Sequence, residues 1–147
     1  MIDRFDLFTR YITRIYRDLQ RIKNLEMVDF NLKGIHVMCL FHLNRSPNGL
    51  TVTGLGQACT EDKAAISRTV SDLVERGLVT VDSSKKYRAP IVLTEKGLNI
   101  ADRIDELVCS AVSAGGAGLT DSERETFYKA LTTISDNLSE YLKGEPL

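Results

Sequence analysis

Apolar residues recur at every third or fourth position near both ends of the chain, a spacing that predicts amphipathic helices. The first stripe lies within residues 3–23, with arginines between its members: Leu7, Phe8, Tyr11, Ile12, Ile15, Leu19 and Ile22. A loop over 24–31 and a second helix over about 32–43 should follow. A long helix is predicted over 95–113. After a glycine-rich break, a last helix carries Phe127, Leu131, Ile134, Leu138 and either Tyr141 or Leu142, and Thr120 should cap it.

The apolar pattern changes between residues 50 and 97, where helical spacing gives way to alternation. A short helix over 50–59 precedes a second helix, which Gly77 should end by adopting the left-handed conformation. Apolar and polar residues then alternate over 79–81 and again over 91–93, which predicts a β-hairpin. This order of elements is a winged helix-turn-helix, which places one helix in the DNA major groove. The predicted fold class is therefore mainly α.

The second helix of this pair has an inner face and a face suited to base contacts. Its inner face is apolar and consists of Ile66, Val70, Leu73 and Val74. Arg68 projects nearly opposite their centre, and arginine can bond bidentately to guanine. The residues around it are small or basic and are Lys63, Ala64, Ser67 and Ser71. Thr60 is expected to cap this helix, with Glu61 and Asp62 in its first turn. An ordinary solvated face is the alternative interpretation.

The tip of the predicted hairpin is too long for a two-residue turn and holds the cations Lys85, Lys86 and Arg88. Such a wing can reach phosphates or the minor groove, where arginine favours the narrow A·T-rich form. Thr51, at the start of the preceding short helix, is a further candidate for holding phosphate. The alternative is that the lysines only blunt an exposed hairpin edge.

Three segments of the chain resemble the MarR family of transcriptional regulators (multiple antibiotic resistance regulator). Asp62 to Arg68 resembles that family's recognition-helix core, Leu73 to Val79 its helix-to-wing exit, and Leu93 to Gly97 its wing-to-helix exit. The helix order matches along nearly the whole chain. The family often has Asp-x-Arg at the wing tip, where this chain has Lys85-Lys86-Tyr87-Arg88, so either Arg88 or Lys86 would take the arginine's role.

The resemblance also implies a function and a domain organisation. It implies an obligate homodimer that binds a palindromic operator in double-stranded DNA, usually as a repressor that an effector releases. The chain would then form a single MarR-like domain over 1–147. Within it, 1–31 and 114–147 would form the dimerisation region, 32–97 the winged helix-turn-helix and 95–113 a connecting helix.

The terminal helices offer more apolar surface than one small domain can easily cover, and such surface usually marks an interface. The predicted dimer interface consists of Phe8, Tyr11, Ile15, Leu131, Ile134, Leu138 and Tyr141. A small anionic or aromatic effector is expected where the first, second and fifth helices meet. Its cleft would be lined by Tyr11, His36, Cys39 and Arg103. A well-packed core would give the same pattern of residues.

Charge and length narrow the class of protein. The formal net charge is −1, yet cations gather between Lys63 and Arg88 and anions between Asp121 and Leu147. Local charge decides where a polyanion docks, so the near-neutral total does not exclude DNA. No apolar run approaches the ~18 residues of a membrane span. The first residues do not resemble a signal peptide, so we expect a cytoplasmic protein without membrane contact.

Residues for other chemistry are sparse. The three cysteines are widely spaced and argue against a disulfide framework, although Cys59 could report redox state. His36 and Cys39 have a spacing that metal ligands use, but no third ligand is evident, so no metal or cofactor is expected. Neither a phosphate loop nor a catalytic triad can be assembled, so the chain is not expected to be an enzyme. A winged-helix module for protein–protein contacts, without DNA binding, remains the alternative.

Overall fold

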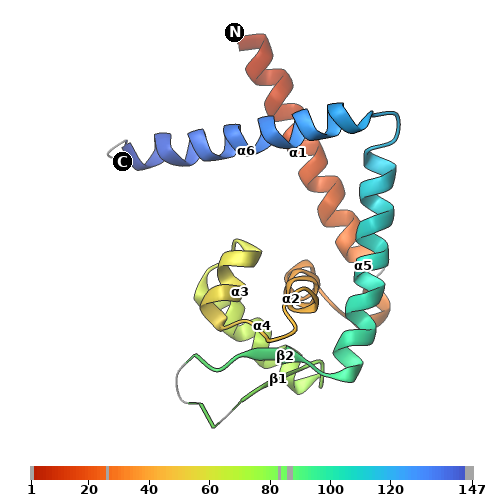
Figure 1. The fold of residues 1–147 in the computed structure, drawn as a ribbon, viewed down its shortest axis with the longest axis vertical. Helices are drawn as coiled ribbons and strands as arrows, with labels where there is room; N and C mark the ends of the chain where they lie inside the picture. The colour runs from red at the N-terminus through yellow and green to blue at the C-terminus, as the bar shows by residue number, and fades with distance from the viewer. Residues whose placement is uncertain (1, 26, 83, 86–87, 145–147) are drawn as a thin grey trace. The chain divides into compact units, whose positions relative to one another are not determined.

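The computed structural model describes residues 2–25, 27–82, 84–85 and 88–144. In chain order the elements are α1 (Ile2–Leu25), η1 (Val28–Phe30), α2 (Gly34–Asn44), α3 (Val52–Cys59), α4 (Lys63–Glu75), β1 (Val79–Val81), β2 (Ile91–Leu93), α5 (Glu95–Gly115) and α6 (Asp121–Gly144) (Figure 1). The chain divides into two compact units, Met1–Val108 and Cys109–Leu147. The predicted fold class, a mainly helical winged helix-turn-helix, is confirmed.

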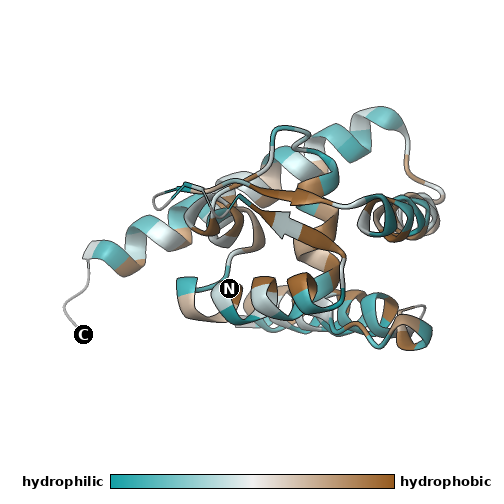
Figure 2. Ribbon diagram, turned by 90° about the horizontal axis from the view of Figure 1, so that it is seen from below, coloured by the Kyte–Doolittle hydropathy of each residue, from teal (hydrophilic) through white to brown (hydrophobic). Residues whose placement is uncertain are grey.

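The larger unit is built around one hydrophobic core to which α2, α3, α4, the hairpin and the first half of α5 contribute. Its fully buried side chains include Leu40, Leu55, Ile66, Leu73, Ile91 and Ile104. Both strands of the hairpin show hydrophobic colour in Figure 2, in keeping with their place over this core. On α4 the inner face matches the prediction except at Val74, which is 43% exposed. Thr69, which was not predicted to face inward, is buried. Its hydroxyl donates to the carbonyl of Ala65 at 2.8 Å, so the buried polar group has a partner.

The first two helices differ from prediction at their ends. The expected loop over 24–31 contains the short 3-10 helix η1, preceded by the buried Met27. Helix α2 begins at Gly34 rather than near Leu32. The reason is a capping contact: the backbone N–H of Lys33 donates to Nδ1 of His36 at 2.9 Å, which keeps Lys33 extended. Leu32 is buried in the core all the same.

The turn between α3 and α4 corrects the prediction that Thr60 caps the recognition helix. Thr60 ends α3 instead, in the left-handed conformation with φ of 56°. Asp62 is the N-cap of α4, and its carboxylate accepts the N–H of Ala65 at 2.7 Å. A carboxylate suits this position because the helix N-terminus carries partial positive charge. The N–H of Glu61 closes the turn by donating to the carbonyl of Gly56 at 3.0 Å.

The β-hairpin is short and has a third participant. β1 and β2 are antiparallel, with Val79 opposite Leu93 and Val81 opposite Ile91. Leu50 forms an isolated bridge with Ile91 through two backbone hydrogen bonds of 3.1 and 2.8 Å. The base of the wing is thereby tied to the segment that leads into α3, a pairing the sequence pattern did not reveal.

The smaller unit contains the end of α5 and all of α6. The N–H of Thr120 donates to the carboxylate of Glu123 at 2.8 Å, and the N–H of Glu123 returns to the Thr120 hydroxyl, which confirms the predicted cap. None of the α6 residues that the structure describes is buried. In Figure 2 this helix, which leads to the label C, shows mostly hydrophilic and neutral colours. Among the described residues, no helix is both long and apolar enough to cross a membrane.

Candidate DNA interface

The outward face of α4 carries the residues predicted to contact bases. Lys63, Ala64, Ser67, Arg68 and Ser71 are all exposed. The hydroxyl of Ser71 donates to the carbonyl of Ser67 at 3.0 Å and so lies close against the helix. Apart from Lys63 at the start of α4, Arg68 is therefore the only long side chain among these five residues. This arrangement suits a helix that reads bases, since the small residues let the helix come close to the base edges of the major groove.

Helix α3 adds a second surface beside this face. Thr51 caps α3 by accepting the N–H of Gly54 at 3.0 Å, which places its hydroxyl at a helix N-terminus, where phosphate is favoured. A shallow hollow over α3 and the start of α4 is lined by Val52, Thr53, Gly56, Gln57, Thr60, Glu61 and Lys63. The exposed Thr53 and Gln57 were not predicted as site residues. Thr53 and Gln57 are four residues apart and so share one face of α3, and this spacing is the signal that could have found them.

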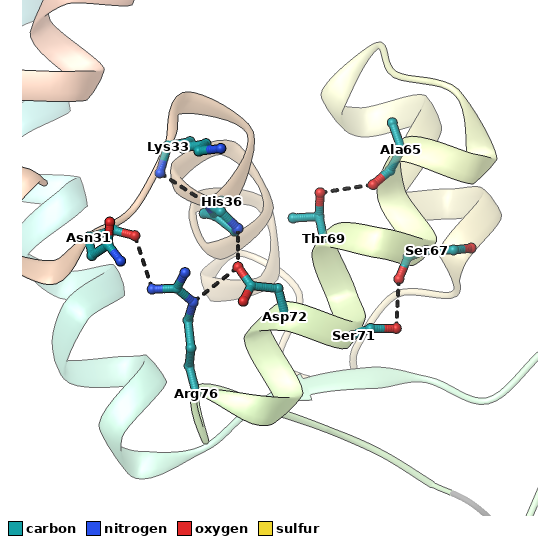
Figure 3. A network of polar contacts seen from close by, with 9 residues as sticks. All are labelled: Asn31, Lys33, His36, Ala65, Ser67, Thr69, Ser71, Asp72 and Arg76. Carbon is teal, nitrogen blue, oxygen red and sulfur yellow. Dashed lines mark hydrogen bonds and ion pairs between the residues drawn. The ribbon is translucent and has the colours of Figure 1, made fainter.

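A polar network fixes the C-terminal half of α4 to α2 (Figure 3). Nε2 of His36 donates to the carboxylate of Asp72 at 2.7 Å, while Nδ1 accepts from the backbone of Lys33. Nε of Arg76 lies 3.0 Å from the same oxygen of Asp72. The guanidinium of Arg76 also donates to the carbonyl of Asn31 at 2.9 Å. The carboxylate of Asp72 thus connects α4 to α2, and the guanidinium of Arg76 connects it to Asn31 before α2.

The charges in this network follow from burial. Burial lowers the pKa of His36 and outweighs the opposing effect of Asp72. His36 is therefore neutral near pH 7, with the proton assigned to Nε2 and with Nδ1 available as an acceptor. The Arg76 guanidinium, and after it His36, hold the pKa of Asp72 below its usual value. Protonation of Nδ1 would remove the acceptor for the backbone N–H of Lys33 at the start of α2. Sequence reasoning missed this network because it joins residues distant in the chain.

The end of α4 and the start of α5 interlock through backbone contacts. Gly77, with φ of 69°, confirms the predicted helix stop, and the N–H of Leu78 returns to the carbonyl of Leu73 at 2.9 Å. The hydroxyl of Thr94 donates to the carbonyl of Gly77 at 2.7 Å and accepts the N–H of Gly97 at 3.0 Å. A Cβ on Gly97 would lie only 1.9 Å from the carbonyl oxygen of Leu78. The wing therefore leaves and re-enters the core at one rigid junction.

The described part of the wing presents cations to solvent. Lys85 is exposed, and its N–H donates to the carbonyl of Asp82 at 3.2 Å. Ser84 donates to the carboxylate of Asp82 from both its hydroxyl and its N–H, which lowers the pKa of Asp82 and shapes the outgoing turn. Arg88 is exposed, with a left-handed φ of 54°. Lys86 lies outside the described residues.

The residues predicted to line an effector cleft are either engaged with other residues or exposed to solvent. His36 and Cys39 are both buried on α2, and His36 belongs to the network around Asp72. The guanidinium of Arg103 lies 5.3 Å from the centre of the Phe30 ring, a cation–π contact. Tyr11 is 50% exposed on α1. His36 and Cys39 are thus both buried on α2 with other partners, while Arg103 contacts Phe30.

The residues predicted for the dimer interface are mostly uncovered in the single chain. Exposure ranges from 39% to 62% for Tyr11, Ile15, Ile134, Leu138 and Tyr141. Phe8 and Leu131 are partly buried. Both terminal helices therefore expose large apolar side chains, which is unusual for a protein that remains a monomer.

Comparison with known proteins agrees with this architecture. The family model of the MarR family matches residues 30–88. The crystal structure of the transcriptional regulator SlyA is similar at 25% identity over 92% of this chain and 96% of that chain, with a TM-score of 0.81. The fold is also shared by the Staphylococcus aureus MepR–DNA complex, at 17% identity over 89% and 97% of the two chains with a TM-score of 0.79. A Listeria monocytogenes MarR-family regulator complexed with a 26mer DNA matches at 23% identity, 95% and 96% coverage and a TM-score of 0.76.

The family match covers the helix-turn-helix and the outgoing strand of the wing, which are the segments whose geometry is described above. The shared fold extends well beyond them, over most of the chain. The winged helix-turn-helix of this chain is therefore similar to that of the MarR family of transcriptional regulators.

Proposed function

We propose that this chain is a sequence-specific DNA-binding transcriptional regulator. The observation that carries the proposal is the outward face of α4, where the exposed Arg68 stands among small residues. The helix beneath it is held by the network around Asp72 and by the junction at Gly77. A rigid helix with one arginine among small residues can enter a major groove and present that arginine to guanine. The DNA complexes of MepR and of the Listeria regulator, which share the fold, support the proposal.

We propose that the chain makes two kinds of contact with DNA. The residues on α4 read bases: Lys63, Ala64, Ser67, Arg68 and Ser71. The residues around them hold phosphate or enter the minor groove: Thr51, Lys85, Lys86 and Arg88. The first group sets sequence preference, whereas the second sets overall affinity and its dependence on salt.

The proposed active form is a homodimer on a palindromic operator. The exposed apolar residues of α1 and α6 supply its interface. Two recognition helices would then meet half-sites one turn of duplex apart, about 34–36 Å. Repression in the cytoplasm, relieved by a small molecule near Tyr11, His36, Cys39 and Arg103, completes the proposal. Such a ligand acts through its different affinity for the two spacings of the helices.

Selection from random duplexes tests the function. The full chain is mixed with a random-sequence duplex library, bound duplexes are recovered and sequenced over several rounds, and the enriched duplex is titrated at several salt concentrations. We expect an inverted repeat whose affinity falls steeply as salt rises. If no sequence is enriched and binding does not depend on salt, the DNA proposal is wrong. The winged helix would then serve protein–protein contacts.

A further inference from the structure

Two free thiols from different helices meet in the core of the larger unit, Met1–Val108, which is called the winged-helix unit below. Sγ of Cys39 on α2 lies 3.9 Å from Sγ of Cys59, the last residue of α3. Cys39 is fully buried, whereas Cys59 is partly exposed. We propose that Cys39 and Cys59 form a reversible disulfide under oxidising conditions and that this disulfide weakens the DNA binding of α4. The second half of the inference rests on the proposed function, and the first half does not.

The two thiols differ in a way that assigns each a role. The hydrogen bond to Cys59, together with burial, raises the pKa of Cys39 and keeps that thiol protonated. The same hydrogen bond lowers the pKa of Cys59 and outweighs partial burial and the carboxylate of Glu61, which both raise it, while the cation of Lys23 also lowers it. A thiolate is the nucleophile in oxidation, so the accessible Cys59 reacts first and Cys39 resolves the product.

The reaction balances with a peroxide as the oxidant. The Cys59 thiolate attacks one oxygen of hydrogen peroxide and breaks the O–O bond. This step gives a sulfenic acid on Cys59 and hydroxide, which takes up a proton to become water. The sulfur of Cys39 then attacks the sulfenic sulfur, forming the S–S bond, and the Cys39 proton leaves with the hydroxyl group as a second water. Both sulfurs are oxidised and the peroxide is reduced. A dithiol reductant reverses the change by thiol–disulfide exchange.

The bond would act directly on the turn that positions α4. A disulfide holds its sulfurs about 2.05 Å apart, so the contact of 3.9 Å must close. Cys59 is followed at once by Thr60, whose left-handed conformation ends α3, and then by Asp62, which caps α4. A densely packed core cannot absorb such a movement without shifting its neighbours. The displacement therefore falls on the α3–α4 turn and on the hollow beside Lys63.

Oxidation of the full chain, followed by three readouts, tests the proposal. The reduced protein is treated with dilute hydrogen peroxide, and part is then returned to dithiothreitol. Intact mass and peptide mapping detect loss of two hydrogen atoms and the linkage of Cys39 to Cys59. Amide hydrogen exchange follows the α3–α4 turn without DNA, and fluorescence anisotropy follows affinity for the selected duplex. Cys59→Ser removes the attacking thiol at a partly exposed position, and Cys109→Ser is the matched control, because Cys109 lies exposed on α5.

We expect the wild type and Cys109→Ser to form the Cys39–Cys59 bond and to regain both thiols on reduction. Affinity for the duplex should fall by about tenfold or more on oxidation, with faster exchange in the turn, because the half-sites demand a fixed helix placement. Cys59→Ser should show neither change. Sulfinic acid on Cys59 without a bond, or a bond through Cys109, would overturn the disulfide. An oxidised protein with unaltered exchange and affinity would overturn the switch. Should the reduced protein bind no duplex, the proposed function fails, while mass and exchange still decide the disulfide and its effect on the turn.

Discussion

Helices α4 and α6 both carry apolar residues at helical spacing, yet they differ in what covers those residues. On α4 the apolar residues Ile66, Val70 and Leu73 are buried by the chain itself. On α6 the structure describes no buried residue, and Leu138 is 53% exposed. A periodic stripe therefore predicts a helix in both places, but the identity of the covering surface has to come from elsewhere. For α4 that surface is the core of the same unit, and for α6 we propose a second copy of the chain.

The largest expected effect lies at the junction that holds the core of the winged-helix unit. Gly97→Ala would place a Cβ 1.9 Å from the carbonyl oxygen of Leu78, so the start of α5 must move away from the wing. The free energy of unfolding should fall by about 1–3 kcal/mol or more. Gly115→Ala is the control, since a Cβ there meets nothing within 4 Å. That variant should have the urea midpoint of the wild type, or a slightly higher one, in titrations followed by circular dichroism. Equal stability of the two variants would contradict the close packing of this junction.

The next largest effect is expected on α6, where a substitution should change the oligomeric state and leave the winged-helix unit intact. Leu138→Asp places a charge on the exposed apolar stripe, where it would have to be desolvated in a dimer, so we expect dissociation to monomers. The helical content and urea midpoint of the winged-helix unit should change little. Thr133→Asp changes an exposed residue on the opposite side of α6 and should leave the dimer intact. Light scattering at micromolar concentration measures both variants, and a wild-type chain that is already monomeric would refute the interface.

A smaller effect is expected at the wing. Lys85→Ala removes one exposed cation proposed to hold phosphate, so binding should weaken about evenly on specific and unrelated duplexes. The slope of log affinity against log salt should become shallower by about one. Lys129→Ala, on the exposed surface of α6, serves as control and should keep the wild-type slope. Anisotropy titrations at several salt concentrations decide the matter, and an unchanged slope for Lys85→Ala would exclude its phosphate contact.

The smallest effect concerns pH and the network beneath α4. Burial lowers the pKa of His36 from 6.5, so below pH 6.5 the unfolded chain takes up a proton that the folded chain resists. The free energy of unfolding should therefore fall as pH drops below 6.5 until the folded pKa is passed, and should not depend on His36 above 6.5. His36→Gln should flatten this slope. His42→Gln should flatten it as well, because burial also lowers the pKa of His42, so the double variant should lose more of the slope than either single variant. Urea midpoints between about pH 5 and 8 measure the slopes, and an unchanged slope in His36→Gln would show that His36 does not contribute to the pH dependence.

Local signals in the sequence predicted much of the winged-helix unit. Gly77 ends α4 because only a left-handed residue closes that turn, and Thr120 caps α6 through a reciprocal contact with Glu123. The exposed side of α4 followed from helical geometry, since Arg68 lies opposite the buried Ile66 and Leu73. These features depend on residues within a few positions of one another, which a sequence displays directly.

Features that depend on distant partners were not predicted. Thr60 and Asp62 are both good capping residues, and the tight turn after α3 selected between them. The bridge from Leu50 to Ile91 and the pairing of Cys39 with Cys59 join segments that only the folded core brings together. No periodicity reports such contacts, because side-chain spacing describes one element at a time.

One titration tests the central proposal most directly, that the outward face of α4 reads DNA sequence. Wild type, Arg68→Ala and the control Arg17→Ala, an exposed arginine on α1, are titrated against the selected duplex and against duplexes altered at each base pair. We predict that Arg68→Ala loses about 1–3 kcal/mol of binding free energy and no longer discriminates at one base pair of each half-site. Arg17→Ala should keep the affinity and preference of the wild type. If Arg68→Ala binds every duplex as the wild type does, α4 does not read the operator through this residue, and the account is contradicted.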